Sequence, residues 1–187
     1  MLKVLRHTAA LISGWWGAAL QHNPSVAASI LRRKRLGTSC LIDTGVTIVN
    51  ANTFTAGTGC ALYHGTYVLN TQGSMTMGEN SHLGALCYVN VCHGSLSIGD
   101  DVAIGPHTSM IVYSNHYKEG TKVTEERIQQ DIVIGNNVFV GAHCTILPGT
   151  VIGDHVVIGA GSVVKGTLEG PAIYAGAPCK KIRDGWA

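Results

Sequence analysis

A six-residue period runs through most of the chain from Ala56 onward and constrains its fold more than any other feature. Its longest unbroken series is Ile134, Val140, Ile146, Ile152, Ile158 and Val164. Four residues after the large aliphatic positions stands a residue that is usually small, as at Cys60, Ser81, Cys87, Thr108, Cys144 and Ser162. A repeat of this kind has to be recognised before single elements are assigned. Two inward positions in every six residues suit a narrow prism of short strands, so the pattern predicts an all-β solenoid.

A second, longer period is superimposed on the first in the middle of the chain. The segment YVLNTQGSMTMGENSHLG at 67–84 matches YVNVCHGSLSIGDDVAIG at 88–105 with a shift of 21 residues. Three hexads make a coil of 18 residues, so each of these coils carries about three extra residues at one corner. The extra residues fall near 71–74 and near 92–95.

The longest interruption of the repeat lies between Met110 and Ile134. A single hexad would need six residues there, so about 18 residues are expected to leave the solenoid as the loop 113–131. Loops of this length without structure of their own are usually functional. The loop begins with Ser114-Asn115-His116 and contains most of its charges in its second half.

Residues 1–37 precede the repeat, and their pattern predicts a helical segment. The uncharged run 8–20 has 13 residues, which is short of the roughly 20 that a bilayer span needs. A signal peptide is a rival interpretation of this run. A second helix is predicted to begin at Asn23-Pro24 and to end near Gly37 after the basic cluster 32–35. Packing on the solenoid is one role for residues 1–35, and peripheral contact with an anionic membrane surface is the other.

The composition favours an oligomer in a reducing compartment. Charged residues make up only 13% of the chain, which is low for a soluble monomer and suggests that some surface is covered. The net charge of +2 is too small to indicate nucleic-acid binding. The six cysteines form no C-x-x-C pair, and Cys60, Cys87 and Cys144 fall on small inward positions. Free structural thiols are typical of the cytoplasm.

Four features of the sequence resemble a known family. They are the hexads at 98–105, the interruption with Asn-His near its start, the series IVIGNNVFVGAHC from 132 and the tail AIYAGAPCKKIR at 172–183. They are similar to the hexapeptide-repeat transferases, and among these to galactoside, maltose and polysaccharide-assembly O-acetyltransferases. The resemblance implies a left-handed parallel β-helix, although right-handed crossovers are the general rule. The expected organisation is a helical segment at 1–37, the β-helix at 38–170 with the loop 113–131, and a C-terminal cap at 171–187.

The same resemblance implies a reaction and the residues that perform it. His116 matches the family's general base, which takes the proton of a sugar hydroxyl that attacks acetyl-CoA directly. Asn115 is a candidate positioning residue, and Asn90 and His93 are candidates for acceptor binding. The positions matching the cofactor groove are Phe139, Ala142, Ala160, Lys165 and Lys180, with Lys181 beside them. The groove lies between chains in this family, so a homotrimer is implied, and no metal is required.

Alternatives remain for the acceptor and for catalysis itself. Transfer to an amine, an amino acid hydroxyl or an antibiotic would use the same scaffold. A non-catalytic hexapeptide-repeat scaffold is a further alternative. A zinc carbonic anhydrase on this prism is disfavoured, because its three histidine ligands have no match in the spacing of His107 and His116.

Overall fold

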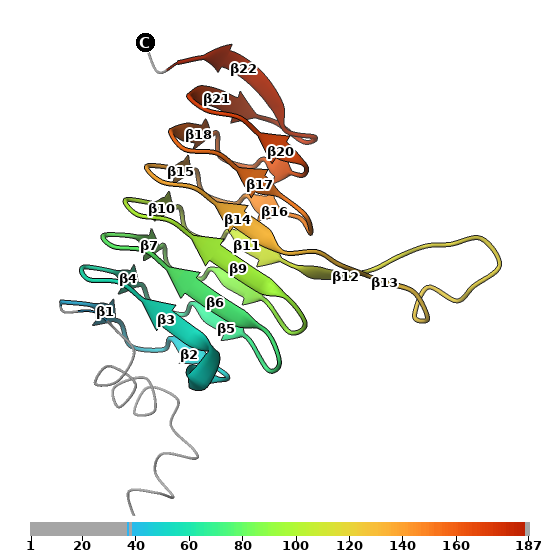
Figure 1. Cartoon of the computed structure of the whole chain (residues 1–187), viewed down its shortest axis with the longest axis horizontal. Helices are drawn as coiled ribbons and strands as arrows, with labels where there is room; N and C mark the ends of the chain where they lie inside the picture. Colours follow the sequence, from blue (N-terminus) through green and yellow to red (C-terminus); the bar gives the residue numbers. More distant parts are fainter. Residues whose placement is uncertain (1–36, 38, 186–187) are drawn as a thin grey trace, which may run out of the picture.

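The computed structural model describes residue 37 and residues 39–185, in which short strands wind into a three-sided parallel β-helix (Figure 1). The β1 sheet contains β1 (Leu41–Ile42), β4 (Ala61–Leu62), β7 (His82–Leu83), β10 (Ala103–Ile104), β15 (Phe139–Val140), β18 (Val156–Ile158), β21 (Ala172–Ala175) and β22 (Lys180–Asp184). The β2 sheet contains β2 (Thr47–Ile48), β5 (Tyr67–Leu69), β8 (Tyr88–Asn90), β11 (Ser109–Ile111), β16 (Thr145–Ile146) and β19 (Val163–Val164). The β3 sheet contains β3 (Phe54–Ala56), β6 (Ser74–Met77), β9 (Ser95–Ile98), β14 (Ile132–Ile134), β17 (Val151–Ile152) and β20 (Thr167–Leu168). The solenoid expected from the sequence is therefore confirmed.

The hexad positions supply the axis of the prism. The series that begins at Ile134 and ends at Val164 moves from one sheet to the next at every step, and all six side chains are buried. Each apolar side chain contacts those of the coils above and below, so the core is one continuous column. Burial of this column is the main stabilising term of a fold whose strands are only two to four residues long in most coils.

Several of the small inward residues carry a thiol or a hydroxyl, and these groups have a polar function. At this position a thiol or hydroxyl donates to a glycine carbonyl of the following coil, as from Cys60 to Gly78 at 2.7 Å and from Ser81 to Gly99 at 2.8 Å. A small donor both fits the corner and satisfies a carbonyl that would otherwise be buried without a partner. Burial raises the pKa of the Cys87 thiol to about 11, so this cysteine is a protonated structural residue.

The longer coils and their bulges also agree with the sequence period. Tyr67 lies beside Tyr88, whereas in the later coils Thr145 lies beside Val163. The extra residues form the corners that connect the β2 sheet to the β3 sheet. A Cβ atom on Gly73 would overlap the carbonyl oxygen of Val91, so the bulge requires glycine at this position.

The interruption forms an arm rather than a structureless loop. β12 (Tyr113–Asn115) and β13 (Arg127–Gln129) pair as an antiparallel hairpin that projects from the solenoid, as the yellow segment of Figure 1 shows. It leaves after β11 in the β2 sheet and returns at β14 in the β3 sheet, so it emerges at the same corner as the bulges.

The two ends of the chain differ in what the structure describes. The helices predicted at 1–37 lie outside the described residues except for Gly37, and the only described helix is the short 3-10 turn η1 (Ala51–Thr53). Between residues 39 and 185 there is no helix with the length and hydropathy of a membrane span. At the other end, β21 continues the β1 sheet parallel to β18, and β22 folds back antiparallel over it.

Candidate active site

The arm has two faces that carry different side chains. Tyr113 lies opposite Gln129 and Asn115 lies opposite Arg127, and residues directly opposite in an antiparallel pair project to the same side. Tyr113, Asn115, Arg127 and Gln129 thus form one face, which we call the lower face. The intervening residues form the other, the upper face. The backbone N–H of His116 donates to the carbonyl of Glu126 at 3.1 Å, so the pairing continues one residue further and places His116 on the upper face.

Contacts at the base of the arm fix which way the lower face is turned. The Tyr113 ring lies 5.0 Å from the ring of His93, which belongs to the bulge of the preceding coil. Arg127 Nε donates to Tyr113 Oη at 2.6 Å, and its guanidinium carbon lies 5.8 Å from the centre of the ring. The lower face is therefore directed towards the N-terminal coils.

The upper face is directed the opposite way. The carbonyl of Gln130 accepts from the N–H of Gly149 at 3.3 Å, and a Cβ on Gly149 would lie 2.7 Å from Gln130 Oε1. His116 shares this side, towards the C-terminal coils. Its imidazole is exposed and forms no hydrogen bond or ion pair with residue 37 or with residues 39–185. The nitrogen lone pair of the neutral ring is thus available to a substrate.

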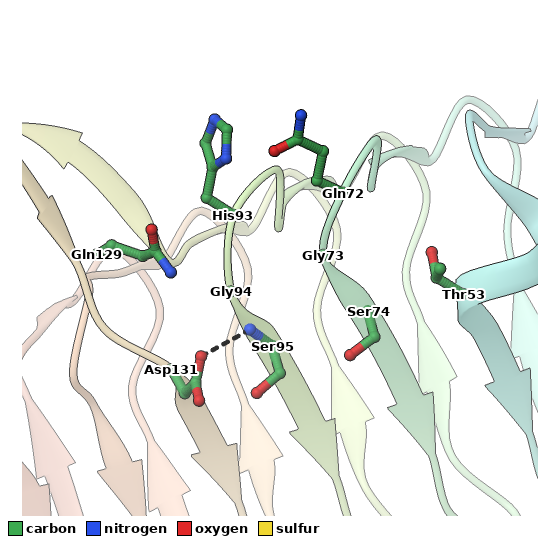
Figure 2. A pocket seen from close by; sticks show the side chains of 9 residues that line it. All are labelled: Thr53, Gln72, Gly73, Ser74, His93, Gly94, Ser95, Gln129 and Asp131. Carbon is green, nitrogen blue, oxygen red and sulfur yellow. Dashed lines mark hydrogen bonds between the residues drawn. The ribbon is translucent and has the colours of Figure 1, made fainter.

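A hollow of about 340 Å³ lies below the arm, between its return strand and the bulges. Its lining consists of Thr53, Gln72, Gly73, Ser74, His93, Gly94, Ser95, Gln129 and Asp131. Figure 2 shows Gln72 and His93 projecting from successive bulges, with Ser74 and Ser95 in a row beneath them. Asp131 Oδ1 accepts from the Ser95 N–H at 2.7 Å and thereby joins the arm to the preceding coil.

The two candidates for acceptor binding are placed differently. His93 lines the hollow, as its position in the bulge suggested. Asn90 does not line it; the side-chain carbonyl of Asn90 accepts from the N–H of Cys92 at 3.3 Å and so shapes the bulge. Asn115 lies on the lower face of the arm and is exposed.

The residues matched to a cofactor groove lie at another corner. Ala142 and Ala160 occupy successive coils where the β1 sheet turns into the β2 sheet, and the carbonyl of Ala142 accepts from the N–H of Gly161 at 2.8 Å. A Cβ on Gly141 would lie 2.5 Å from the nitrogen of Ala160, so the coils are in close contact at this corner, where the exposed His143 follows Ala142. Phe139 is 50% exposed on β15, just before this corner.

The lysines are more dispersed. Lys165 follows β19 and lies at the corner of the arm, whereas Lys180 lies on β22. Both are exposed and neither forms an ion pair with another described residue. Lys181 differs, because it donates to Asp184 at 2.8 Å, and this hydrogen bond raises the pKa of Lys181. One chain therefore does not bring His116, Ala142 and Ala160 together.

Sequence reasoning missed much of the lower side of the site. Tyr113, Arg127, Gln129, Asp131 and Gln72 were not proposed, although all lie in the hollow or beside it. Alternation along the arm could have grouped the first three if a hairpin had been assumed. In the ranges that the structure describes, no three side chains of His, Cys, Asp or Glu converge as a metal site would require.

Comparisons with known proteins agree with this fold. Residues 131–166 match the family described as bacterial transferase hexapeptide (six repeats). The chain is 30% identical over 155 residues to WbbJ of Escherichia coli K12, whose name describes a lipopolysaccharide biosynthesis O-acetyl transferase; the match covers 77% of this chain and 75% of WbbJ. It is 38% identical over 112 residues to the galactoside O-acetyltransferase of the same organism, covering 57% of this chain and 55% of the relative. The chain thus spans about half the length of that relative.

Solved structures show the same architecture. A galactoside acetyltransferase in complex with coenzyme A superimposes with a TM-score of 0.60 at 27% identity, over 84% of this chain and 68% of that one. The N-acyltransferase AntD from Bacillus cereus gives a TM-score of 0.76 at 24% identity, over 82% and 84% of the two chains, and this likeness shows the fold alone. The three-sided coil and its hexads define a left-handed parallel β-helix of the acyltransferase class. The chain belongs to the bacterial hexapeptide-repeat transferase family.

Proposed function

We propose that the protein is an acetyl-CoA-dependent O-acetyltransferase that acts on a sugar hydroxyl in the biosynthesis of a surface polysaccharide. The identity with WbbJ over three quarters of that protein supports the O-acetyl transfer and the polysaccharide setting. The match to galactoside O-acetyltransferase supports a sugar acceptor. The likeness to a galactoside acetyltransferase that binds coenzyme A supports acetyl-CoA as the donor.

The free imidazole of His116 is the observation on which the mechanism rests. As the sugar hydroxyl attacks the thioester carbonyl, His116 takes its proton, and a tetrahedral oxyanion forms. Collapse of this intermediate expels the thiolate of coenzyme A, which receives the proton from the imidazolium and leaves as the thiol. The acetyl group has then moved from sulfur to oxygen, and no covalent enzyme intermediate is needed.

The separation of the corners supports an assembled site. The small residues Ala142 and Ala160 allow a ligand to approach the backbone closely, and Phe139 offers an aromatic surface at the edge. Since His116 lies at a different corner of the same chain, we propose a homotrimer in which the arm of one subunit completes the groove of the next. The exposed cations of Lys165 and Lys180 would pair with the phosphates of the donor.

The cell biology is a further part of the proposal. We place the protein in the cytoplasm, where acetyl-CoA is formed, and keep contact of residues 1–35 with the inner face of the membrane as a hypothesis. These residues lie outside the part of the chain that the structure describes.

The test is acetyl transfer by the full chain to a panel of mono- and oligosaccharides, with free coenzyme A measured by chromatography. Chromatography is preferable to a thiol reagent because the protein carries six free cysteines. His116→Ala should reduce the rate at least about 100-fold. His155→Ala is the matched control, because His155 is exposed at the corner between the β3 and β1 sheets, away from arm and groove. Equal rates for His116→Ala and the native protein would refute the assignment.

A further inference from the structure

Five hydroxyl groups form a flat array on the outer face of the β3 sheet. Along each of its first three strands the side chains alternate, so the outward positions are Thr55 on β3, Ser74 and Thr76 on β6, and Ser95 and Ser97 on β9. The registers place them side by side, with Ser74 opposite Ser95 and Thr76 opposite both Thr55 and Ser97. Strands lie about 4.8 Å apart, so the hydroxyls form regular rows along the axis of the solenoid.

These hydroxyls are free, unlike the buried hydroxyls at the inward positions. Thr66, Ser81 and Thr108 all donate to glycine carbonyls of neighbouring coils. None of the five outward hydroxyls hydrogen-bonds to residue 37 or to residues 39–185. Their donors and acceptors are satisfied only by water, and an ordered ligand can replace that water.

The array runs directly into the hollow below the arm. Ser74 and Ser95 belong to both, and the row that they form ends at Asp131, which follows Ser95 in register. Oδ1 of Asp131 is used by the Ser95 N–H, and its second oxygen has no hydrogen bond to the described part of the chain. The amides of Gln72 and Gln129 and the imidazole of His93 close the hollow (Figure 2). Amide, imidazole and carboxylate groups of this kind can all form hydrogen bonds with the hydroxyl groups of a ligand.

The charge of the surface selects the class of ligand. No lysine or arginine lines the hollow, and the guanidinium of Arg127 beside it is bound to Tyr113 Oη and to the carbonyl of Glu126. Within the lining, a phosphate or an acidic sugar would therefore meet the Asp131 carboxylate and no lysine or arginine, which favours a neutral ligand. A peptide strand cannot add to β6 or β9, because both edges of each strand are already paired.

Resting on the proposed function, we infer that the outer face of β3, β6 and β9 together with the hollow binds a neutral oligosaccharide. The sugar chain crosses the strands, and each strand offers hydroxyls to one sugar residue. The hollow lies on the lower face of the arm, whereas His116 lies on the upper face. The surface thus holds sugar residues remote from the one that is acetylated and makes a long glycan a better acceptor than a monosaccharide.

The experiment uses the full chain on an array of neutral and phosphorylated bacterial glycans of defined length, followed by calorimetry with the glycans retained. Neutral glycans of three or more sugars should be retained. The double variant Thr76→Val with Ser97→Ala should weaken their binding about tenfold, because two hydrogen bonds are lost without a change of shape. Thr167→Val is the matched control, since it removes an exposed outward hydroxyl on β20 of the same sheet, three strands away from β9, and should bind as the native protein does.

Acetyl transfer to a monosaccharide is measured in parallel and should be the same in the double variant. Retention of phosphorylated glycans only, or equal binding by the native protein and the double variant, would overturn the inference. Acetylation of a monosaccharide without retention of any oligosaccharide would also overturn it, while leaving the proposed function intact. Oligosaccharide binding without acetyl transfer to any acceptor would contradict the proposed function alone. If the double variant does not fold, Thr55→Val in the same array replaces it.

Discussion

Arg127 donates a hydrogen bond from Nε to the hydroxyl of Tyr113 at 2.6 Å, across the base of the arm. The two residues lie on the outgoing and returning strands, so this bond joins the strands where they leave the solenoid. The Tyr113 ring in turn contacts His93 in the preceding coil. The side chain of Tyr113 therefore links the arm to the bulge that lines the hollow.

The Tyr113→Phe variant tests whether this link positions the arm. It keeps the ring contact with His93 and removes only the hydrogen bond to Arg127. We expect kcat to fall about threefold to tenfold, with KM for acetyl-CoA unchanged, because His116 would be held less firmly. Hydrogen exchange of residues 113–116 should become faster, while the melting temperature changes by a degree or two. Tyr117→Phe at the exposed end of the arm is the control, and an equal loss of kcat in both variants would contradict a positioning role.

The unpaired Lys165 and Lys180 are expected to hold the phosphates of the donor. Replacing Lys165 or Lys180 with alanine should raise KM for acetyl-CoA about threefold to tenfold and leave kcat unchanged, since phosphate pairing is the same in ground and transition states. Lys181→Ala should have a smaller effect, because its ammonium group is already paired with Asp184. Steady-state kinetics at two salt concentrations checks this, and a KM unaffected by either change would exclude both lysines from the donor site.

The raised pKa of Cys87 predicts a loss of stability in alkali. Below the ordinary thiol pKa of 9.0 the group is protonated in the folded and the unfolded chain, and it does not affect stability. As pH rises from 9 towards 11, the unfolded chain loses this proton first, so the free energy of unfolding falls. The loss should reach about 2 kcal/mol.

Cys87→Ser provides the comparison, because the fold already accepts Ser81 and Ser162 at equivalent inward positions. Urea unfolding at pH 8 and pH 10.5 should show the native protein losing more stability than the variant. Parallel pH profiles of the two proteins would count against this account.

Substitution of a glycine in the bulge should cause a local defect with two consequences. Gly73→Ala should lower the free energy of unfolding by about 3 kcal/mol, because the new methyl group overlaps the carbonyl oxygens of Val91 and Gly94. Oligosaccharide binding should fall with it, since the bulge lines the hollow. Gly120→Ala at the end of the arm is the comparison. It has open space around it and only a left-handed φ of +82°, so its cost should be about 1 kcal/mol. Similar losses in the two variants would contradict the steric explanation.

The sequence itself determined the solenoid, the buried axis and the extent of the arm. Ile134 to Val164 are inward because the spacing of six places them on successive sheets, and Cys60, Cys87 and Cys144 are buried because they occupy the small inward position at a corner. These relations are local and periodic, so they recur in every repeat and can be recognised in the sequence. The place of His93 in a bulge also followed from counting the residues of its coil.

Only the tertiary structure decided which residues meet across coils. Ser95 and Asp131 are 36 residues apart in the sequence. They come together because β9 and β14 are neighbours in the sheet, although the arm lies between them along the chain. The pairing within the arm turns His116 away from the hollow. The registers of β3, β6 and β9 align five free hydroxyls beside Asp131. Such relations depend on coil length, bulges and the twist of the arm together, and no single stretch of sequence encodes them.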